Sequence, residues 1–158
     1  MYNYLFEEKC FEKTFESHTK FNFELQKKVR ELLSKLLDIE YEEIEVIYYE
    51  KRADKVKLKL EAKKKIEENY LFKVELEITY FNTTIISLTT YISRVIEVYL
   101  SGATPAEDLV FNSIQEFTKK YLYADILSDL KLKYEELSKK IYENLEILLT
   151  FQNNNLIS

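Results

Sequence analysis

Few side chains in this chain of 158 residues have the type and spacing that catalysis requires. His18 is the only histidine, so catalytic triads and metal sites built from several histidines are excluded, and its polar surroundings predict an exposed turn. Cys10 is the only cysteine and lies among aromatic residues without a nearby histidine, which indicates a buried structural thiol. A single glycine leaves no glycine-rich phosphate loop. The sequence therefore predicts no catalytic residue, no cofactor and no metal site.

One short pattern, Glu61-Ala62-Lys63, is typical of a catalytic centre. A Glu-x-Lys spacing on a strand can hold a divalent metal beside a catalytic lysine, and a helix followed by strands and another helix resembles the opening of the PD-(D/E)xK nuclease core. The acidic partner should come from a neighbouring strand, whereas Asp54 precedes the same strand. An alternating solvated strand face explains these residues equally well. A metal-dependent nuclease is therefore the less favoured alternative.

Composition favours a single globular domain spanning 1–158, since 46% of the residues are hydrophobic and 32% are charged. The net charge of −5 is spread over interleaved lysines and glutamates, which argues against a nucleic-acid partner. A lone cysteine fits a reducing cytoplasm. No run approaches the roughly 20 apolar residues of a membrane span, and the first 17 residues do not resemble a signal peptide. We expect a cytoplasmic protein that is not inserted in a membrane.

The elements that would position functional groups are predicted from hydrophobic periodicity. A strand is expected over 9–16, and a helix capped by Asn22 over 22–38. The period then changes to two residues over 44–48, 56–63 and 72–80, which predicts three half-buried strands. Their short connections allow only antiparallel neighbours.

The charges of the last two strands suggest a register for their hairpin. If Lys57 faces Glu77, Lys59 faces Glu75 and Glu61 faces Lys73, every outward pair has opposite charges. A shift of two residues would place like charges together, so we expect the first arrangement.

The remaining chain predicts helices. Apolar residues at helical spacing predict a first helix from Thr84 to Leu100. A capping box at Thr104, with Pro105 at the first helical position, starts a second helix that continues to Tyr121. A long third helix covers 125–151 and has Asn144 at an otherwise apolar position of its seam. The predicted fold is α+β: a four-stranded antiparallel sheet in β-α-β-β-β order, covered on one face by the C-terminal helices.

Three segments resemble the SecB family of export chaperones, which includes chaperones of toxin–antitoxin systems. The segment 12–16 resembles the first strand of the family and 54–81 its central hairpin. The most specific match is 91–96, with Arg94, followed by the only glycine and only proline at Gly102 and Pro105 and by an aromatic–asparagine pair at 111–112. Relative to the family, the helix 22–38 is an insertion and the helix 125–151 is extended.

The resemblance implies an ATP-independent holdase, not an enzyme, that binds exposed apolar segments of unfolded or precursor proteins. It implies a homo-oligomer, dimer or tetramer, that contacts the SecA motor or an antitoxin. The client-binding candidates are aromatic residues of the strands: Phe11, Phe15, Tyr48, Tyr49, Phe72 and Tyr80. By resemblance, the acidic residues that would contact the motor are Glu12, Glu16 and Glu75. A module for one specific protein partner, such as an antitoxin or a phage or host factor, is the alternative.

Overall fold

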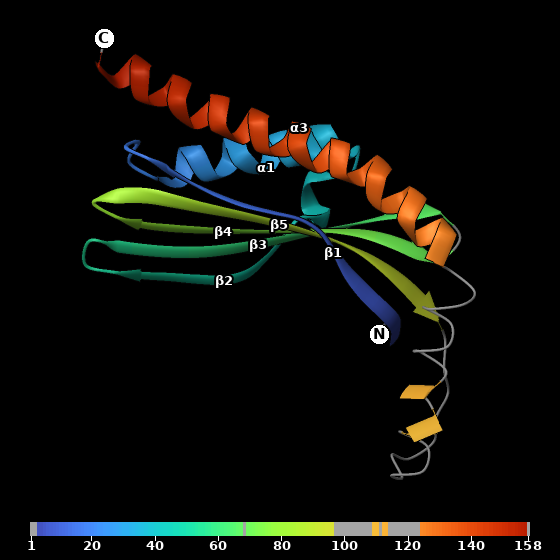
Figure 1. Ribbon diagram of the computed structural model, residues 1–158. Coiled ribbons are helices and arrows are strands. Elements are labelled where there is room, and N and C mark those ends of the chain that lie inside the picture. The colour runs from blue at the N-terminus through green and yellow to red at the C-terminus, as the bar shows by residue number, and fades with distance from the viewer. Residues whose placement is uncertain (1–2, 68, 97–108, 111, 114–123, 158) are drawn as a thin grey trace.

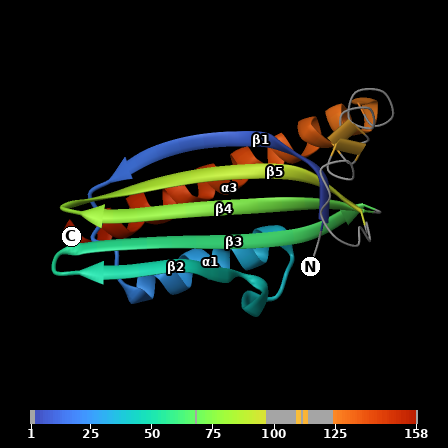
Figure 2. The same ribbon diagram turned by 90° about the horizontal axis from the view of Figure 1, so that it is seen from below.

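The computed structural model describes residues 3–67, 69–96, 109–110, 112–113 and 124–157. These residues form an α+β fold with one five-stranded antiparallel sheet in the order β1-β5-β4-β3-β2 (Figures 1 and 2). Two helices, α1 and α3, lie on one face of the sheet, hereafter the helix face, and we call the opposite face the open face (Figure 1). The α+β class with helices on one face of an antiparallel sheet is confirmed, whereas the predicted number of strands is too low.

Helix α1 (Phe23–Leu37) agrees with its prediction. The Asn22 side chain accepts a hydrogen bond from the Leu25 backbone N–H at 2.8 Å, which satisfies one of the free donors at a helix start. The helix ends at Asp38, whose left-handed backbone (φ 55°) lets its N–H reach the Ser34 carbonyl. The buried stripe is Leu25, Val29, Leu33 and Leu37.

The predicted three-strand meander is present as β2 (Glu45–Arg52), β3 (Lys55–Glu67) and β4 (Tyr70–Phe81). A short 3-10 turn, η1 (Tyr41–Glu43), precedes β2. Along β3 and β4 buried residues alternate with exposed or half-buried ones, as the period of two residues predicts. The inward residues pack against the helices and the outward ones form the open face.

The predicted register of the β3–β4 hairpin is wrong by two residues. The observed pairs are Lys57 with Thr79, Lys59 with Glu77, Glu61 with Glu75 and Lys63 with Lys73. This is the arrangement that the simple charge argument rejected, so cross-strand charge did not decide the register.

Turn geometry and a third strand explain the observed register. The connection is shorter than the prediction assumed and turns through Asn69, whose φ of 64° asparagine tolerates well. Glu7 of β1 then supplies the counter-charge for Lys73, at 3.1 Å. Lys59 lies 4.0 Å from Glu75 across the diagonal of the pair. The charges are thus balanced partly by a diagonal neighbour and partly by Glu7, which belongs to another strand and which an argument from β3 and β4 alone could not include.

The largest correction concerns β5 (Thr83–Ile96), which was predicted as a helix from Thr84 to Leu100. It pairs with β4 through a tight turn at Asn82 (φ 65°). Its inner positions are buried, and its outer ones are exposed or half-buried, apart from the buried Ser93. Nine of its fourteen residues are β-branched, which favours a strand: Thr83, Thr84, Ile85, Ile86, Thr89, Thr90, Ile92, Val95 and Ile96. Apolar residues that matched helical spacing therefore belong to a strand.

Strand β1 (Asn3–Ser17) is longer than predicted and pairs with β5 over its length. A register shift between Lys9 and Phe11 marks a β-bulge, and both Cys10 and Phe11 pack against the core. The Cys10 thiol donates to the Lys131 carbonyl at 3.3 Å, and burial raises its pKa. Cys10 is half-buried, whereas a buried thiol was predicted. His18 is exposed, as predicted.

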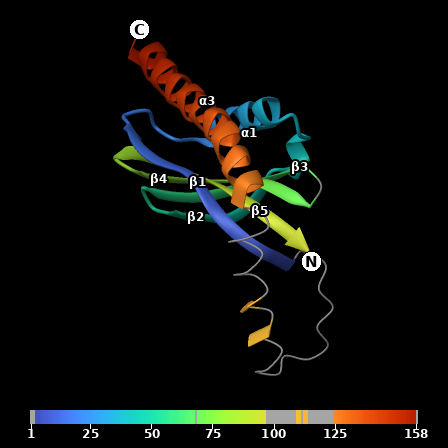
Figure 3. The same ribbon diagram turned by 45° about the vertical axis from the view of Figure 1, so that its right-hand side comes forward.

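Helix α3 (Ala124–Ile157) lies across β1 and β5 and contacts α1 on the same face (Figure 3). It is longer than the predicted helix over 125–151. The predicted seam, with Leu137, Asn144 and Leu148, is shifted by one residue at these three positions, because Ser138, Leu145 and Leu149 are the buried residues. Asn144 instead donates to the Lys140 carbonyl. The capping box at Thr104 and the Gly102–Pro105 junction lie outside the described residues.

The core lies between the sheet and the two helices. Its largest fully buried side chains come from α1, β3, β4, β5 and α3. Polar contacts also join the layers, since Thr90 and Ser138 share a buried hydrogen bond of 2.8 Å.

Among the described residues, no helix is both long and apolar enough to cross a membrane.

Candidate functional site

Strand β2 is the outermost strand of the sheet on the side of α1, and it exposes apolar side chains. Val46, Ile47, Tyr48 and Tyr49 are between 43 and 54% exposed. Because β2 pairs with β3 alone, its other edge offers unpaired backbone groups in the described sheet. A contiguous apolar run on a free edge is unusual for an edge strand and is therefore the first feature of a candidate site.

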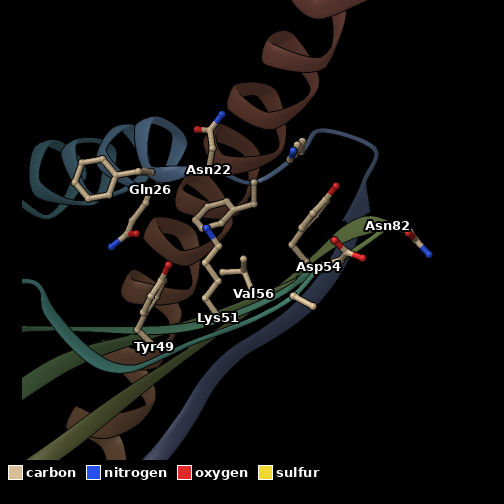
Figure 4. Close-up of a pocket in the computed structure, with 12 residues that line it drawn as sticks. Asn22, Gln26, Tyr49, Lys51, Asp54, Val56 and Asn82 are labelled. Atoms are coloured by element: carbon tan, nitrogen blue, oxygen red, sulfur yellow. The ribbon is translucent and has the colours of Figure 1, made fainter.

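A pocket of about 870 Å³ lies beside this strand (Figure 4). It opens between the start of α1 and the β2–β3 hairpin, and we call it the β2 pocket. Its lining residues are Lys20, Phe21, Asn22, Phe23, Gln26, Tyr49, Lys51, Ala53, Asp54, Val56, Tyr80 and Asn82. The volume falls within the range of small-ligand pockets, about 300–1,000 Å³.

The loop from β1 to α1 forms one wall of the pocket. Thr84 donates to the Thr19 carbonyl and Thr19 donates to the Leu149 carbonyl, both at 2.6 Å, so the loop is fixed to β5 and α3. Phe21 is then buried, with 4% of its surface exposed. Phe23, on the other side of the Asn22 cap, is 79% exposed because it lies off the buried stripe of α1.

The β2–β3 hairpin forms the opposite wall. Its turn passes through Ala53 with a φ of 45°, which places Lys51 opposite Val56. Tyr49 lies opposite Leu58, a fully buried residue, so Tyr49 and Lys51 are on the helix face of the sheet. In Figure 4, Lys51 extends from β2 toward the start of α1, and the ends of Gln26 and Tyr49 point toward one another.

The charges of the pocket are two lysines and one aspartate. Lys20, Lys51 and Asp54 are all exposed, and none has an ion-pair partner within the described part of the chain. The pocket therefore combines aromatic walls with one positive charge in excess, on a chain whose net charge is −5. Such a pocket can bind an apolar group together with an anionic one.

The six aromatic candidates are not gathered into one surface. Tyr49 and Tyr80 line the β2 pocket. Phe72 is completely buried in the core. Phe11 and Phe15 are partly buried against α3, where their ring centroids lie 6.1 and 5.3 Å from that of Tyr142.

Tyr48 lies on the open face, away from the pocket. Its position opposite Lys59 places it there, and its hydroxyl donates to Glu50. This hydrogen bond raises the pKa of Tyr48 and lowers the pKa of Glu50. Tyr48 therefore belongs to the exposed run of β2 but not to the pocket.

Two of the three acidic candidates lie in one row on the open face. Glu12 pairs with Thr89, which pairs with Glu75. Glu75 lies within 3.5 Å of Lys73, so its charge is compensated. Glu16 is exposed further along β1. This face carries acidic residues, but its glutamates are interleaved with lysines.

The two acidic residues of the nuclease alternative, Asp54 and Glu61, are far apart. Lys63 lies 3.3 Å from Glu61 in an ion pair on the open face. Asp54 is seven positions before Glu61 on the same hairpin, which is about 23 Å along an extended strand. Within the described ranges, no three His, Cys, Asp or Glu side chains are grouped so that they could hold a metal.

Sequence reasoning missed most of the β2 pocket. Phe21, Phe23 and Lys20 were not singled out, although Phe23 falls outside the apolar stripe of its helix, which was a signal for an exposed aromatic. Val56 was identified only as a strand residue. The pocket is built from a loop, a helix start and a hairpin, which no local pattern connects.

Comparisons with known proteins give no family for this chain. No family model and no curated protein match it. A solved structure described as Ara h 8.0201 is 13% identical, covering 88% of this chain and 97% of its own, with a TM-score of 0.24. A START superfamily protein from Mycobacterium smegmatis is also 13% identical, covering 77% and 97%, with a TM-score of 0.14. Likenesses this weak bear on neither the fold nor the function.

Proposed function

We propose that this protein binds exposed, extended apolar segments of other polypeptides and acts as an ATP-independent holdase in the cytoplasm. The observation that supports the proposal is the run of exposed apolar residues from Val46 to Tyr49 on a free edge strand beside the β2 pocket. Neither the pocket nor the strand requires a catalytic group for this role.

The physical basis is strand addition. An extended segment that pairs with the free edge of β2 satisfies backbone groups of both chains, and this supplies affinity that does not depend on sequence. Side chains of the segment then cover the exposed surfaces of Val46, Ile47 and Tyr49. Burial of apolar surface contributes roughly 25 cal/mol per Å² before the entropy of ordering the segment is subtracted.

Features of β2 favour reversible binding of short segments. A register shift between Val46 and Tyr48 interrupts the regular ladder, so the longest uninterrupted edge is 48–52. Glu50, Lys51 and Arg52 add charges along this edge, which oppose permanent pairing between copies of the chain. A holdase must release its client, and an interrupted, charged edge is suited to that.

The resemblance to the SecB family supports the proposal less than the surface does. Its most specific segment, 91–96, matched a helix of the family, whereas these residues belong to strand β5. Docking to the SecA motor and assembly into dimers or tetramers remain part of the proposal, and light scattering of the native protein measures the assembly directly.

Suppression of aggregation tests the proposal. We expect the protein, at a stoichiometric ratio and without ATP, to reduce light scattering by a client diluted from denaturant. Tyr49→Ser and Ile47→Lys should weaken this activity, because they remove apolar surface or place a charge on the edge. Ile85→Ser is the matched control, since Ile85 is 45% exposed on β5, away from β2. Absence of suppression by the native protein would refute the proposal.

A binder of one specific partner is the second candidate, favoured by the confinement of the pocket to one end of the sheet. Affinity capture from the native host separates the two candidates. One stoichiometric partner that is lost in Tyr49→Ser would favour the specific binder, whereas many unfolded clients would favour the holdase.

A further inference from the structure

We propose that the β2 pocket selects segments in which a large apolar side chain and a carboxylate lie two residues apart. This inference rests on the proposed binding of extended segments at β2 and adds a sequence preference to it. The occupant is an added strand whose apolar side chain packs beside Tyr49 and whose carboxylate lies beside Lys51.

The spacing follows from the geometry of β2. Tyr49 and Lys51 lie opposite Leu58 and Val56, which places both on the helix face. Side chains on one face of a strand recur every second residue, about 6.4–6.8 Å apart. An added strand has the same repeat, so two of its residues, separated by one, would face Tyr49 and Lys51 together. The residue between them would face the open side.

The apolar half of the pocket lies beside Tyr49. Tyr49 is 54% exposed, so a partner side chain can cover much of its ring. Phe21 and Val56 line the pocket between the loop and the hairpin. Phe23, which is 79% exposed at the rim, adds a second surface for an aromatic or long aliphatic side chain. Such a side chain would replace water on Tyr49, Val56 and Phe23 at once.

The charged half of the pocket lies around Lys51. Its side chain extends from β2 into the space in front of α1 (Figure 4). Lys51 and Lys20 have no ion-pair partner among the described residues, and Asp54 at the rim leaves one positive charge in excess. A carboxylate opposite Lys51 would form a cross-strand pair of opposite charge, whereas a lysine there would be repelled.

Two sources can supply this carboxylate, the side chain of an internal acidic residue or the C-terminus of the bound segment. Fluorescence anisotropy with labelled peptides separates them. One set has both ends blocked and carries an apolar residue and a glutamate separated by one residue, in either order, because an added strand can run parallel or antiparallel to β2. The other has a free C-terminal carboxylate two residues after the apolar one, with its amide as the control.

We expect the glutamate peptide to bind about two- to fivefold more tightly than the same peptide with glutamine, as one cross-strand charge pair predicts. Moving the glutamate next to the apolar residue should remove this gain, because adjacent side chains face opposite sides of a strand. If only the free-carboxylate peptide shows the gain, the terminal carboxylate is the ligand.

Charge exchange provides the decisive control. Lys51→Glu should reverse the preference, so that a peptide with lysine at the acidic position binds better than one with glutamate. Lys57→Glu makes the same charge change on the open face of β3 and should leave the preference unchanged. The inference would be overturned, with apolar binding at β2 intact, if the glutamate peptide bound no better than the glutamine peptide and the free-carboxylate peptide no better than its amide. An unchanged preference in Lys51→Glu would overturn it as well. Absence of binding by every peptide would overturn the proposed function as well.

Discussion

Glu61 of β3 lies directly opposite Glu75 of β4 on the open face, and the neighbouring lysines neutralise this like-charged pair. Lys73 is central to that arrangement. It faces Lys63 across the hairpin, yet its ammonium group donates to Glu7 of β1 at 3.1 Å and lies 3.5 Å from Glu75. The charge balance of the hairpin therefore depends on a strand that is distant in the sequence.

Removing the Glu7 carboxylate should destabilise the sheet. In Glu7→Gln, Lys73 loses its hydrogen-bonded counter-charge while its side chain, 13% exposed, remains opposite Lys63. We expect the free energy of unfolding to fall by about 1 kcal/mol. Urea denaturation measures the change. Glu77→Gln is the control, because Glu77 is exposed on the same face, and an equal loss in both variants would contradict the assigned role of Glu7.

The same contact predicts a loss of stability at alkaline pH. Burial opposes the charged form of Lys73, but the hydrogen bond to Glu7 and the charges of Glu7 and Glu75 outweigh it and raise its pKa above the usual 10.5. A cation whose pKa is raised in the folded state contributes its full stabilisation of the fold at pH values below its unfolded-state pKa. This contribution is lost as the pH rises through the folded-state pKa. The stability difference between the native protein and Glu7→Gln should therefore be constant from neutral pH up to about 10.5 and shrink above it. A difference that grows with pH in urea titrations would exclude this explanation.

The attachment of α3 to the sheet depends on its buried positions. Leu145→Ala removes a fully buried side chain and should lower the free energy of unfolding by about 2–4 kcal/mol. Ile147→Ala, two residues further along the helix, removes a side chain that is 65% exposed and should change it by less than about 0.5 kcal/mol. Thermal or urea unfolding of the two variants tests the assignment, and similar losses would mean that the buried face of α3 is different.

The tight turn between β4 and β5 depends on the left-handed backbone of Asn82. A β-branched residue is disfavoured at its φ of 65°, so Asn82→Val should lower the free energy of unfolding by about 1–2 kcal/mol. Glycine adopts this backbone freely, so Asn82→Gly should have little effect or a slight stabilising one. Equal destabilisation by both substitutions would indicate that the Asn82 side chain, not its backbone, matters.

Local periodicity predicted the elements whose burial pattern can be read from their own residues. The stripe of α1 from Leu25 to Leu37 and the alternation of β3 and β4 needed only their own residues. Strand β5 was missed because apolar residues at Ile85, Leu88 and Ile92 also match a helical repeat, and the β-branched composition and Asn82 were not weighed against it.

Features formed by residues from distant segments could not be predicted from local periodicity. The register of β3 and β4 involves Glu7, which no hairpin rule includes. The β2 pocket joins Phe21, Tyr49 and Tyr80, which come from a loop and two strands. Tyr49 and Tyr80 were identified as binding candidates from their residue type, but only the three-dimensional arrangement places them together and places Phe72 in the core.

The pairing of β1 with β5 also constrains the order in which the protein can fold during its synthesis. The pairs extend from Ser17 with Thr84 to Asn3 with Ile96, so β1, which is synthesised before the other strands of the described sheet, pairs with β5, which is synthesised after them. The β2–β3 and β3–β4 hairpins can close as soon as they emerge, whereas β1 must wait for most of the chain. Until then Phe11 and Phe15 have neither β5 nor α3 to cover them. The nascent chain is therefore itself a polypeptide with an uncovered apolar segment.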